Sequence, residues 1–320
     1  MSAFLQTHEG EIVFKSLDEL VEAARLRGPA RIAVAAGHDP DVIEALEQAQ
    51  SCGLAEPILV GDPGKIRAAA AKAGCTIGAG QIIDEPNDAS AARTAIGLIR
   101  EQKADLLMKG KISTAALIRA VLDKDTGLRT GRLLSQVIVF QVPDVHRLFL
   151  MTDAAINIAP TLEQKADICR NAIEVAHAIG IQRPNVAALC AIEFVNPEMP
   201  ATIDAAGLAL MNLRGQITGA YVEGPIALDV PLSRFAAERK SIESPLTENT
   251  DIFVAPDIEA ANILYRAILY FAGGESGGII VGARVPLILL SRAETPVTKL
   301  RSIAIAWLVA GADRAKAAAQ

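Results

Sequence analysis

The sequence predicts an α/β fold in which two α/β domains carry mostly parallel sheets and enclose a cleft. Short apolar runs of strand length alternate with helix-like segments along nearly all of the 320 residues. A single stretch near residue 140 breaks the alternation, which suggests the change from one domain to the next. Strand–helix alternation at this spacing implies parallel strands that are joined by crossover helices.

The first part of the chain contains four such strand–helix units. Each apolar run is followed by turn residues and then by a segment with helical spacing of apolar side chains. We expect strands at 31–36, 57–61, 81–86 and 104–108, and helices at 41–53, 63–74, 90–102 and 113–122.

Residues 127–153 depart from this pattern. The runs LLSQVIVFQV (133–142) and RLFLMTD (147–153) flank Pro143 and Asp144, which predicts an antiparallel hairpin. A second domain is expected to begin here. We place the first domain at residues 1–135 plus 293–320 and the second, with the dimer interface, at 136–292.

The alternation then resumes in the second part of the chain. The expected strands are 185–193, 217–225 and 251–257, and the expected helices are 162–179, 201–215, 231–241 and 258–273. No fixed-period repeat or low-complexity segment is present.

The stretch 273–292, GGESGGIIVGARVPLILLSR, is the strongest candidate for a site. Its glycines (Gly273, Gly274, Gly277 and Gly278) resemble a glycine-rich loop, although a tight helix-to-strand turn is the alternative. Runs 279–281 and 286–290 are strand-like, and Thr295-Pro296 predicts the start of a buried helix. Ser291 and Arg292 thus follow a strand and precede a helix, where anions bind in open α/β sheets. A guanidinium there suits phosphate.

Two further segments carry candidate ligand-binding side chains. In MKGKIST, Lys109 and Lys111 flank Gly110 after a strand, and Arg119 lies in the next helix; solvated lysines on an ordinary loop are the alternative. Asn262 stands among small residues on the helix after the strand 251–257, which makes a role in a site plausible. Thr152, Asp153 and Asn157 follow another strand and also suit a capping turn.

Composition excludes several classes of function. The net charge of −6 gives no electrostatic case for nucleic acid or an anionic membrane. Four separated cysteines with no Cys/His cluster argue against zinc and fit a reducing cytoplasm. The sequence has no GxxxxGK[ST] or HExxH motif, so we expect no metal and no cofactor.

Several segments taken in order resemble the phosphate acetyl/butyryltransferase family, closer to its butyryltransferase branch. They are MKGKIST, GLRTGRLLSQV, LMTDAAINIAPT, EGPIALD, VAPDIEAANILYRAILYFA and GGIIVGARVPLILLSRAET, which span residues 104–306. The resemblance implies an enzyme that transfers a short acyl group between coenzyme A and phosphate in a ternary complex. It also implies an isocitrate/isopropylmalate dehydrogenase-like two-domain architecture and a homodimer, with coenzyme A as substrate and not as cofactor.

The resemblance also assigns roles to residues. Ser291 and Arg292 correspond to the catalytic pair of the family, with Arg292 holding phosphate and Ser291 stabilising charge on the thioester carbonyl. Arg119 corresponds to a family arginine across a one-residue gap, and Arg132 and Ser135 fall in a loop at the family's cleft. Thr298 replaces an aspartate proposed to deprotonate the coenzyme A thiol. Either another base serves, with Glu294 the nearest carboxylate, or phosphate or water takes the proton.

Two alternatives remain at the level of the sequence. A metal- and NAD-dependent decarboxylating dehydrogenase would share a two-domain cleft, but it needs an aspartate cluster. A non-catalytic protein that binds coenzyme A or acyl phosphate is compatible with the missing aspartate.

Overall fold

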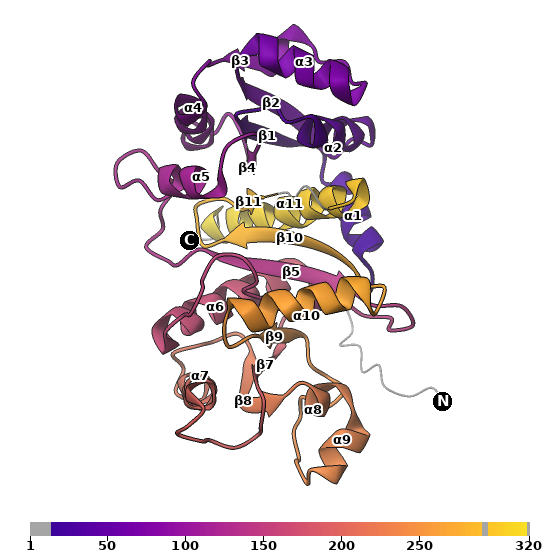
Figure 1. Cartoon of the computed structure of the whole chain (residues 1–320), viewed down its shortest axis with the longest axis vertical. Coiled ribbons are helices and arrows are strands. Elements are labelled where there is room, and N and C mark those ends of the chain that lie inside the picture. The colour runs from indigo at the N-terminus through magenta and orange to yellow at the C-terminus, as the bar shows by residue number, and fades with distance from the viewer. Residues whose placement is uncertain (1–13, 290–293, 319–320) are drawn as a thin grey trace.

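The computed structural model describes residues 14–289 and 294–318, with side chains described as far as residue 312. The eleven strands in this part of the chain form one sheet, in the order β3-β2-β1-β4-β11-β10-β5-β6-β9-β7-β8. The expected α/β fold with mostly parallel strands is therefore confirmed. The strands are nevertheless hydrogen-bonded in one continuous sheet, and not in two, because β11, β10 and β5 connect the two parts (Figure 1).

One end of the sheet is the N-terminal quartet, β3-β2-β1-β4, in which all strands are parallel. All four predicted strand–helix units are confirmed here. The strands are β1 (Ala30–Ala35), β2 (Ala55–Gly61), β3 (Ile82–Asp84) and β4 (Leu106–Lys109), and the α-helices are α2 (Pro40–Ser51), α3 (Pro63–Ala73), α4 (Asp88–Arg100) and α5 (Thr114–Val121). Side chains at the expected turns cap the helices, because Asp39, Asp62 and Asn87 accept hydrogen bonds from first-turn amides.

A helix that was not predicted, α1 (Leu17–Leu26), precedes the first strand. The signal was present, since Ser16 accepts a hydrogen bond from the Glu19 amide and the Glu19 carboxylate accepts one from the Lys15 amide. Its buried face packs on the last helix, α11 (Pro296–Ala318), where the Arg27 guanidinium lies 4.4 Å from the Trp307 ring centroid.

The other end of the sheet is the C-terminal quartet, β6-β9-β7-β8, which is also parallel. Its strands are β6 (Phe149–Thr152), β7 (Asn185–Cys190), β8 (Tyr221–Ala227) and β9 (Ile252–Val254), and its helices are α6 (Leu162–Ala178), α7 (Pro200–Leu213), α8 (Asp229–Leu232), α9 (Arg234–Arg239) and α10 (Ile258–Tyr270). The prediction of a single helix at 231–241 is wrong. Ser233 is extended and caps α9, so it separates two short helices.

The centre of the sheet is formed by β5 (Ser135–Gln141), β10 (Glu275–Val281) and β11 (Leu287–Ile288). The predicted hairpin is confirmed, since β5 and β6 are antiparallel. Strand β10 is antiparallel to both neighbours, whereas β11 is parallel to β4. The two quartets therefore run in opposite directions. Their carboxyl ends point in opposite directions as well. The polar residues that follow the strands of one quartet lie at one end of the sheet's strands, and those that follow the strands of the other quartet lie at the opposite end.

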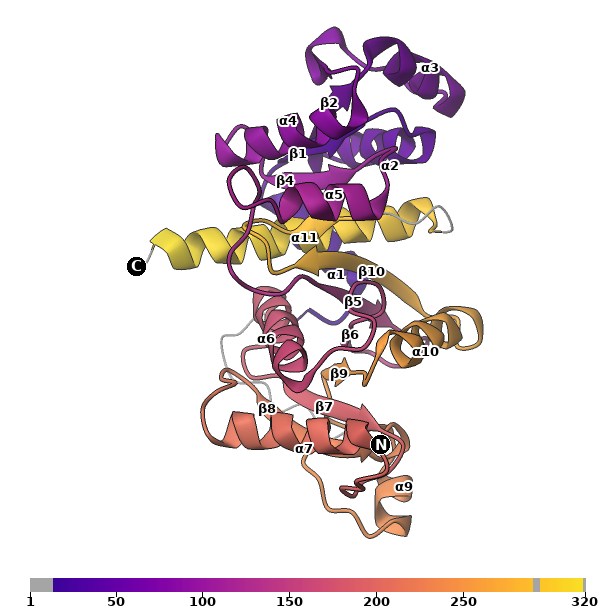
Figure 2. The ribbon, with the colours of Figure 1, turned by 60° about the vertical axis from the view of Figure 1, so that its left-hand side comes forward.

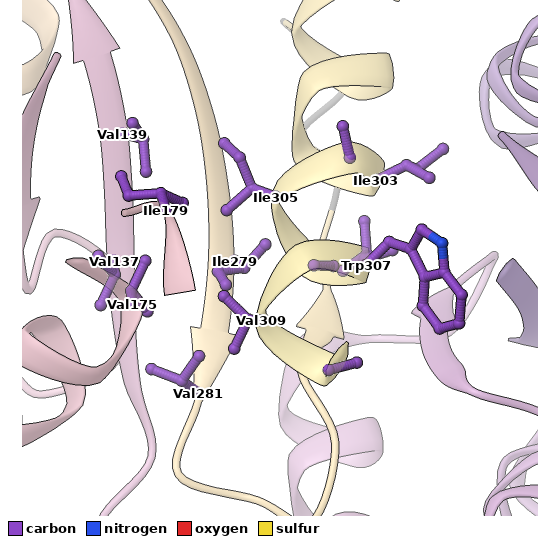
Figure 3. Packing of buried hydrophobic residues seen from close by; sticks show 14 of the residues in the cluster. Val137, Val139, Val175, Ile179, Ile279, Val281, Ile303, Ile305, Trp307 and Val309 are labelled. Carbon is purple, nitrogen blue, oxygen red and sulfur yellow. The ribbon is translucent and has the colours of Figure 1, made fainter. Parts of the chain in front are cut away.

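Helices cover both faces of this sheet. One face carries α1, α2, α3, α6, α7 and α11 over a continuous core, and the other carries α4 and α5 over the N-terminal quartet and α8, α9 and α10 over the C-terminal one (Figures 1 and 2). Figure 3 shows the central contact, where Ile305 and Val309 of α11 lie against Ile279 and Val281 of β10. Among the described residues, no helix is long and apolar enough to cross a bilayer.

Candidate functional site

The β4 junction, residues 109–114, is held firmly against the end of β1. The amides of Gly110 and Lys111 donate to the carbonyls of Ala35 and Ala36 at 2.9 and 2.7 Å. A Cβ at Gly110 would lie 2.2 Å from the Ala36 oxygen, so only glycine fits. Ser113 then caps α5 by accepting from the Ala116 amide. This close approach fixes the position of both lysines.

The two lysines of this junction differ in environment. The Lys109 Nζ atom is half-buried and donates to the carbonyls of Gly110 and Ile112 at 3.0 and 3.3 Å. Lys111 is exposed, and so is Arg119 in the last turn of α5. Within the described part of the chain, neither Lys111 nor Arg119 has a side-chain hydrogen bond or ion pair. Their charges are therefore available to an anion.

Strand β11 lies directly beside β4. Leu287 and Ile288 pair with Leu107 and Met108 in parallel register, so the chain leaves both strands at the same end. Ser291 and Arg292 belong to the segment after β11 and lie outside the described residues. The helix that follows begins as expected, because Thr295 Oγ1 accepts from the Thr298 amide and Pro296 occupies the first turn.

The β5 junction, residues 129–135, has a different environment. Arg132 donates to both carboxylate oxygens of Glu174 at 2.7 and 2.6 Å and to Asn171 Oδ1 at 2.6 Å. Asn171 in turn donates to the Leu133 carbonyl and to Ser135 Oγ, and Ser135 has no exposed surface. The charge of Arg132 is therefore paired with that of Glu174, and Ser135 is inaccessible to solvent. A small cavity of about 260 Å³ opens beside this network.

Asp153 organises the loop that follows β6. This buried carboxylate accepts hydrogen bonds from the amides of Gln136, Ala155, Ile156 and Asn157 and from the Asn157 side chain. The capping alternative thus accounts for Asp153. Asn262, exposed at the start of α10, donates to the Ala154 carbonyl at 3.2 Å.

The four glycines of the 273–278 stretch have different roles. Gly273 has a positive φ of 64° and forms the turn after α10 together with Gly274, so the turn alternative is confirmed for this pair. Gly277 and Gly278 lie inside β10, so the prediction that they form a loop is wrong. Gly277 is buried and faces α11, whereas Gly278 is partly exposed on the opposite face.

Glu294 and Thr298 stand at the start of α11. Thr298 Oγ1 lies 3.0 Å from Thr295 Oγ1 and belongs to the helix cap. Burial raises the pKa of Tyr265, the hydrogen bond with Ser276 opposes this rise, and the negative charge of Glu294 adds to it. This hydrogen bond joins Tyr265 and Ser276 at 3.0 Å.

Sequence reasoning missed three residues that the structure brings into these junctions. Asn171 and Glu174 on α6 hold Arg132, and Gln136 on β5 lies beside Gly278. The available signal was a polar Asn171 among the apolar residues Ile168, Ala172 and Val175 of the predicted helix. In the part of the chain that the structure describes, no group of three or more His, Cys, Asp or Glu side chains could hold a metal ion.

Comparisons with known proteins find similarity to phosphate acyl transferases along nearly the whole chain. The profile of the phosphate acetyl/butaryl transferase family matches residues 15–95 and 87–307. The chain is 44% identical to the phosphate butyryltransferase of Clostridium acetobutylicum over 93% of this chain and 99% of that protein. It is 43% identical to the phosphate acetyltransferase of Thermotoga maritima over 92% and 99%.

A solved structure gives the same result. The branched-chain phosphotransacylase of Enterococcus faecalis V583 superimposes with a TM-score of 0.77 and 29% identity, covering 88% of this chain and 99% of that chain. Matches of this length and identity include the N-terminal quartet, the hairpin and the segment around β11. The chain therefore belongs to the phosphate acetyl/butaryl transferase family.

Proposed function

We propose that this protein is a phosphate acyltransferase that catalyses acyl-CoA + phosphate = acyl phosphate + CoA with a short acyl group. Phosphate attacks the thioester carbonyl directly within a ternary complex, the C–S bond breaks, and the thiolate leaves. The identity to a phosphate butyryltransferase and to a phosphate acetyltransferase over more than 90% of the chain supports the reaction class.

The observation that carries the proposal is the parallel pairing of β4 with β11. It brings the lysines of the β4 junction next to the strand that leads to Ser291 and Arg292. Arg292 holds phosphate through its planar fork, and Ser291 stabilises the charge that develops on the carbonyl oxygen. Lys109, Lys111 and Arg119 attract the phosphates of both substrates. Since Thr298 belongs to the helix cap, we assign the thiol proton to Glu294, the carboxylate nearest to Ser291 in the sequence.

The proposed enzyme has two domains and forms a homodimer. Residues 1–135 plus 293–320 form one domain and 136–292 the other, in an isocitrate/isopropylmalate dehydrogenase-like arrangement with the substrates in the cleft between them. Arg132, Asn262 and Gly278 belong to the cleft side of this arrangement, whereas Gly277 faces α11 and Ser135 is buried in the β5 network. The protein acts as a homodimer in the cytoplasm and needs neither metal nor other cofactor. Exposed apolar side chains on α7 and α9, such as Leu210, Leu213 and Phe235, support a dimer through the second domain.

The test is an acyl-CoA panel, from acetyl to hexanoyl and including branched acyl groups, with release of free thiol measured in the presence of phosphate. Arsenate in place of phosphate is expected to consume short acyl-CoA continuously. Removing the guanidinium in Arg292→Ala is expected to lower kcat/KM by at least about 100-fold, the effect of losing one charge-stabilising donor.

Arg214→Ala is the matched control, since Arg214 is exposed at the end of α7. Normal turnover in Arg292→Ala contradicts the role of Arg292. Tight binding of coenzyme A without phosphate-dependent turnover in the unaltered protein selects the non-catalytic alternative.

A further inference from the structure

Two adjacent glycines in β10 have different physical explanations. A Cβ on Gly277 would lie 2.8 Å from Ile305 Cδ1 and 3.0 Å from two backbone atoms of α11, so the helix requires glycine there. Among the described residues, a Cβ on Gly278 would meet nothing closer than Gln136 Nε2 at 3.5 Å and Ile138 Cγ1 at 3.6 Å, which are ordinary contacts. Packing against the described part of the chain therefore does not explain Gly278.

A glycine inside a strand also has a cost. It is less favourable than alanine because it loses more conformational freedom on folding, and strands favour β-branched side chains. Gly278 is partly exposed in the centre of an eleven-stranded sheet, whereas Ile279 and Ile280 beside it are buried. Strand glycines often mark a bulge, a tight bend, or a place where a ligand or another backbone approaches closely, and the pairing of β10 with β5 is regular through Gly278.

The registers place this exposed spot in line with the β4 junction. Since Leu287 pairs with Ile280 and Leu107, the next residue on the same face of each strand is Leu289, Gly278 and Lys109, respectively. Gly278 and Lys109 are thus separated by two strand spacings, roughly 10 Å. Leu289 precedes Ser291 by two residues in the sequence.

The exposed surface over Gly278 is surrounded by side chains from the same face of the sheet. Leu289 lies toward β4 and Ile138 toward β6, while Ile280 closes one end and Ser276, bonded to Tyr265 of α10, closes the other. Gln136 stands diagonally across on β5, and its carboxamide has no hydrogen-bond partner among the described residues. The surface is thus mainly apolar, with one polar group available to a ligand.

We propose that Gly278 forms the floor of the acyl subsite and that the size of the residue at position 278 sets the longest acyl chain the enzyme accepts. The inference rests on the proposed function and extends it to substrate choice. The short acyl chain lies over Gly278 between Leu289 and Ile138, and the phosphates of the substrates lie toward Lys109. A side chain at 278 would occupy the volume of the outer carbons of the acyl chain and leave room for acetyl.

The experiment compares Gly278→Val and Gly278→Ala with the unaltered protein on acetyl-, butyryl- and hexanoyl-CoA. In Gly278→Val we expect kcat/KM for butyryl- and hexanoyl-CoA to fall by at least about 10-fold, while the value for acetyl-CoA changes less than about 3-fold, since single methylenes in apolar pockets discriminate by about 10–200-fold. Gly278→Ala gives a smaller change of the same kind. Shortening Gln136 in Gln136→Ala is expected to raise the hexanoyl-to-butyryl ratio.

Gly277→Ala is the matched control on the other face of the same strand. It is expected to lower the midpoint of thermal unfolding and to leave the butyryl-to-acetyl ratio unchanged, whereas Gly278→Ala keeps the wild-type midpoint. An equal loss for all acyl lengths in both Gly278 variants, or no loss for any, overturns the acyl subsite. Failure of the unaltered protein to turn over any acyl-CoA with phosphate contradicts the proposed function instead.

Discussion

The β4 junction and the β5 junction look alike in the sequence but differ in the structure. Each places basic side chains and a hydroxyl next to a strand. At the β4 junction, Lys111 and Arg119 are exposed and have no polar side-chain partner among the described residues. At the β5 junction, Arg132 is bound by Glu174 and Asn171, and Ser135 is fully buried.

The position of a cation after a strand therefore does not decide whether the cation can bind a substrate. The partner of the cation decides this, and here the partner is Glu174, which lies on α6, 42 residues after Arg132. A half-exposed guanidinium that already holds a carboxylate must lose that partner before it can bind phosphate. The β4 junction therefore supplies the available positive charge, and the β5 junction supplies rigidity.

The largest expected effect comes from Asn171→Leu. This change leaves the Leu133 carbonyl and Ser135 Oγ without their partner in a buried setting, and it removes one acceptor from Arg132. We expect the free energy of unfolding in urea to fall by about 2–3 kcal/mol. Asn262→Ala, which removes one exposed hydrogen bond, should change it by less than about 0.5 kcal/mol. Equal losses in the two variants would show that the β5 network is not a source of rigidity.

A smaller effect, on binding alone, is expected from Lys111→Ala and Arg119→Ala. Neither side chain makes a polar contact with the described residues, so the free energy of unfolding should stay within about 0.5 kcal/mol of the wild-type value. The KM for acyl-CoA or for phosphate should rise by about 10-fold, which corresponds to about 1.4 kcal/mol of lost attraction. Arg214→Ala serves again as the control. A stable variant with unchanged KM for both substrates removes that residue from the site.

The smallest effect concerns Cys169, which lies on α6 two residues before Asn171. Burial raises the pKa of its thiol to about 12, so it is almost entirely protonated at pH 8. Alkylation of the native protein should be very slow there and should rise about tenfold per pH unit. Because the folded pKa is the higher one, the thiol's contribution to stability is present below pH 9 and is lost as the pH rises toward 12. Faster alkylation in Asn171→Leu at pH 8 would report loosening of α6; an unchanged rate would show that the β5 network does not hold that helix.

Much of the fold could be predicted because each strand–helix unit carries its own local signals. Buried runs such as 31–36, caps such as Asp39 and the turn at Pro143-Asp144 act within a few residues. Helix α1 was also within reach of such reasoning, since Ser16 and Glu19 form a local cap. The continuous sheet was not, because β11 pairs with a strand that precedes it by about 180 residues.

The candidate site was predictable only in part, because it also depends on the pairing of strands that are far apart in the sequence. The proximity of Lys109 to the strand before Ser291 follows from a parallel register that no local pattern encodes. Gly277 and Gly278 are indistinguishable in the sequence, yet one faces a helix and the other faces away from it. Alternation along a strand gives them opposite directions, but only the structure tells which direction α11 occupies.

The place of β10 and β11 between β4 and β5 also has a consequence for the order in which the chain can be assembled. During synthesis, both quartets are complete before residue 275 is made, but β4 and β5 still present open edges. The last strands to be translated fill the middle of the sheet, and α11 then covers them. A nascent chain that stalls in this interval would expose two unpaired inner edges, which makes those edges the natural target of a chaperone.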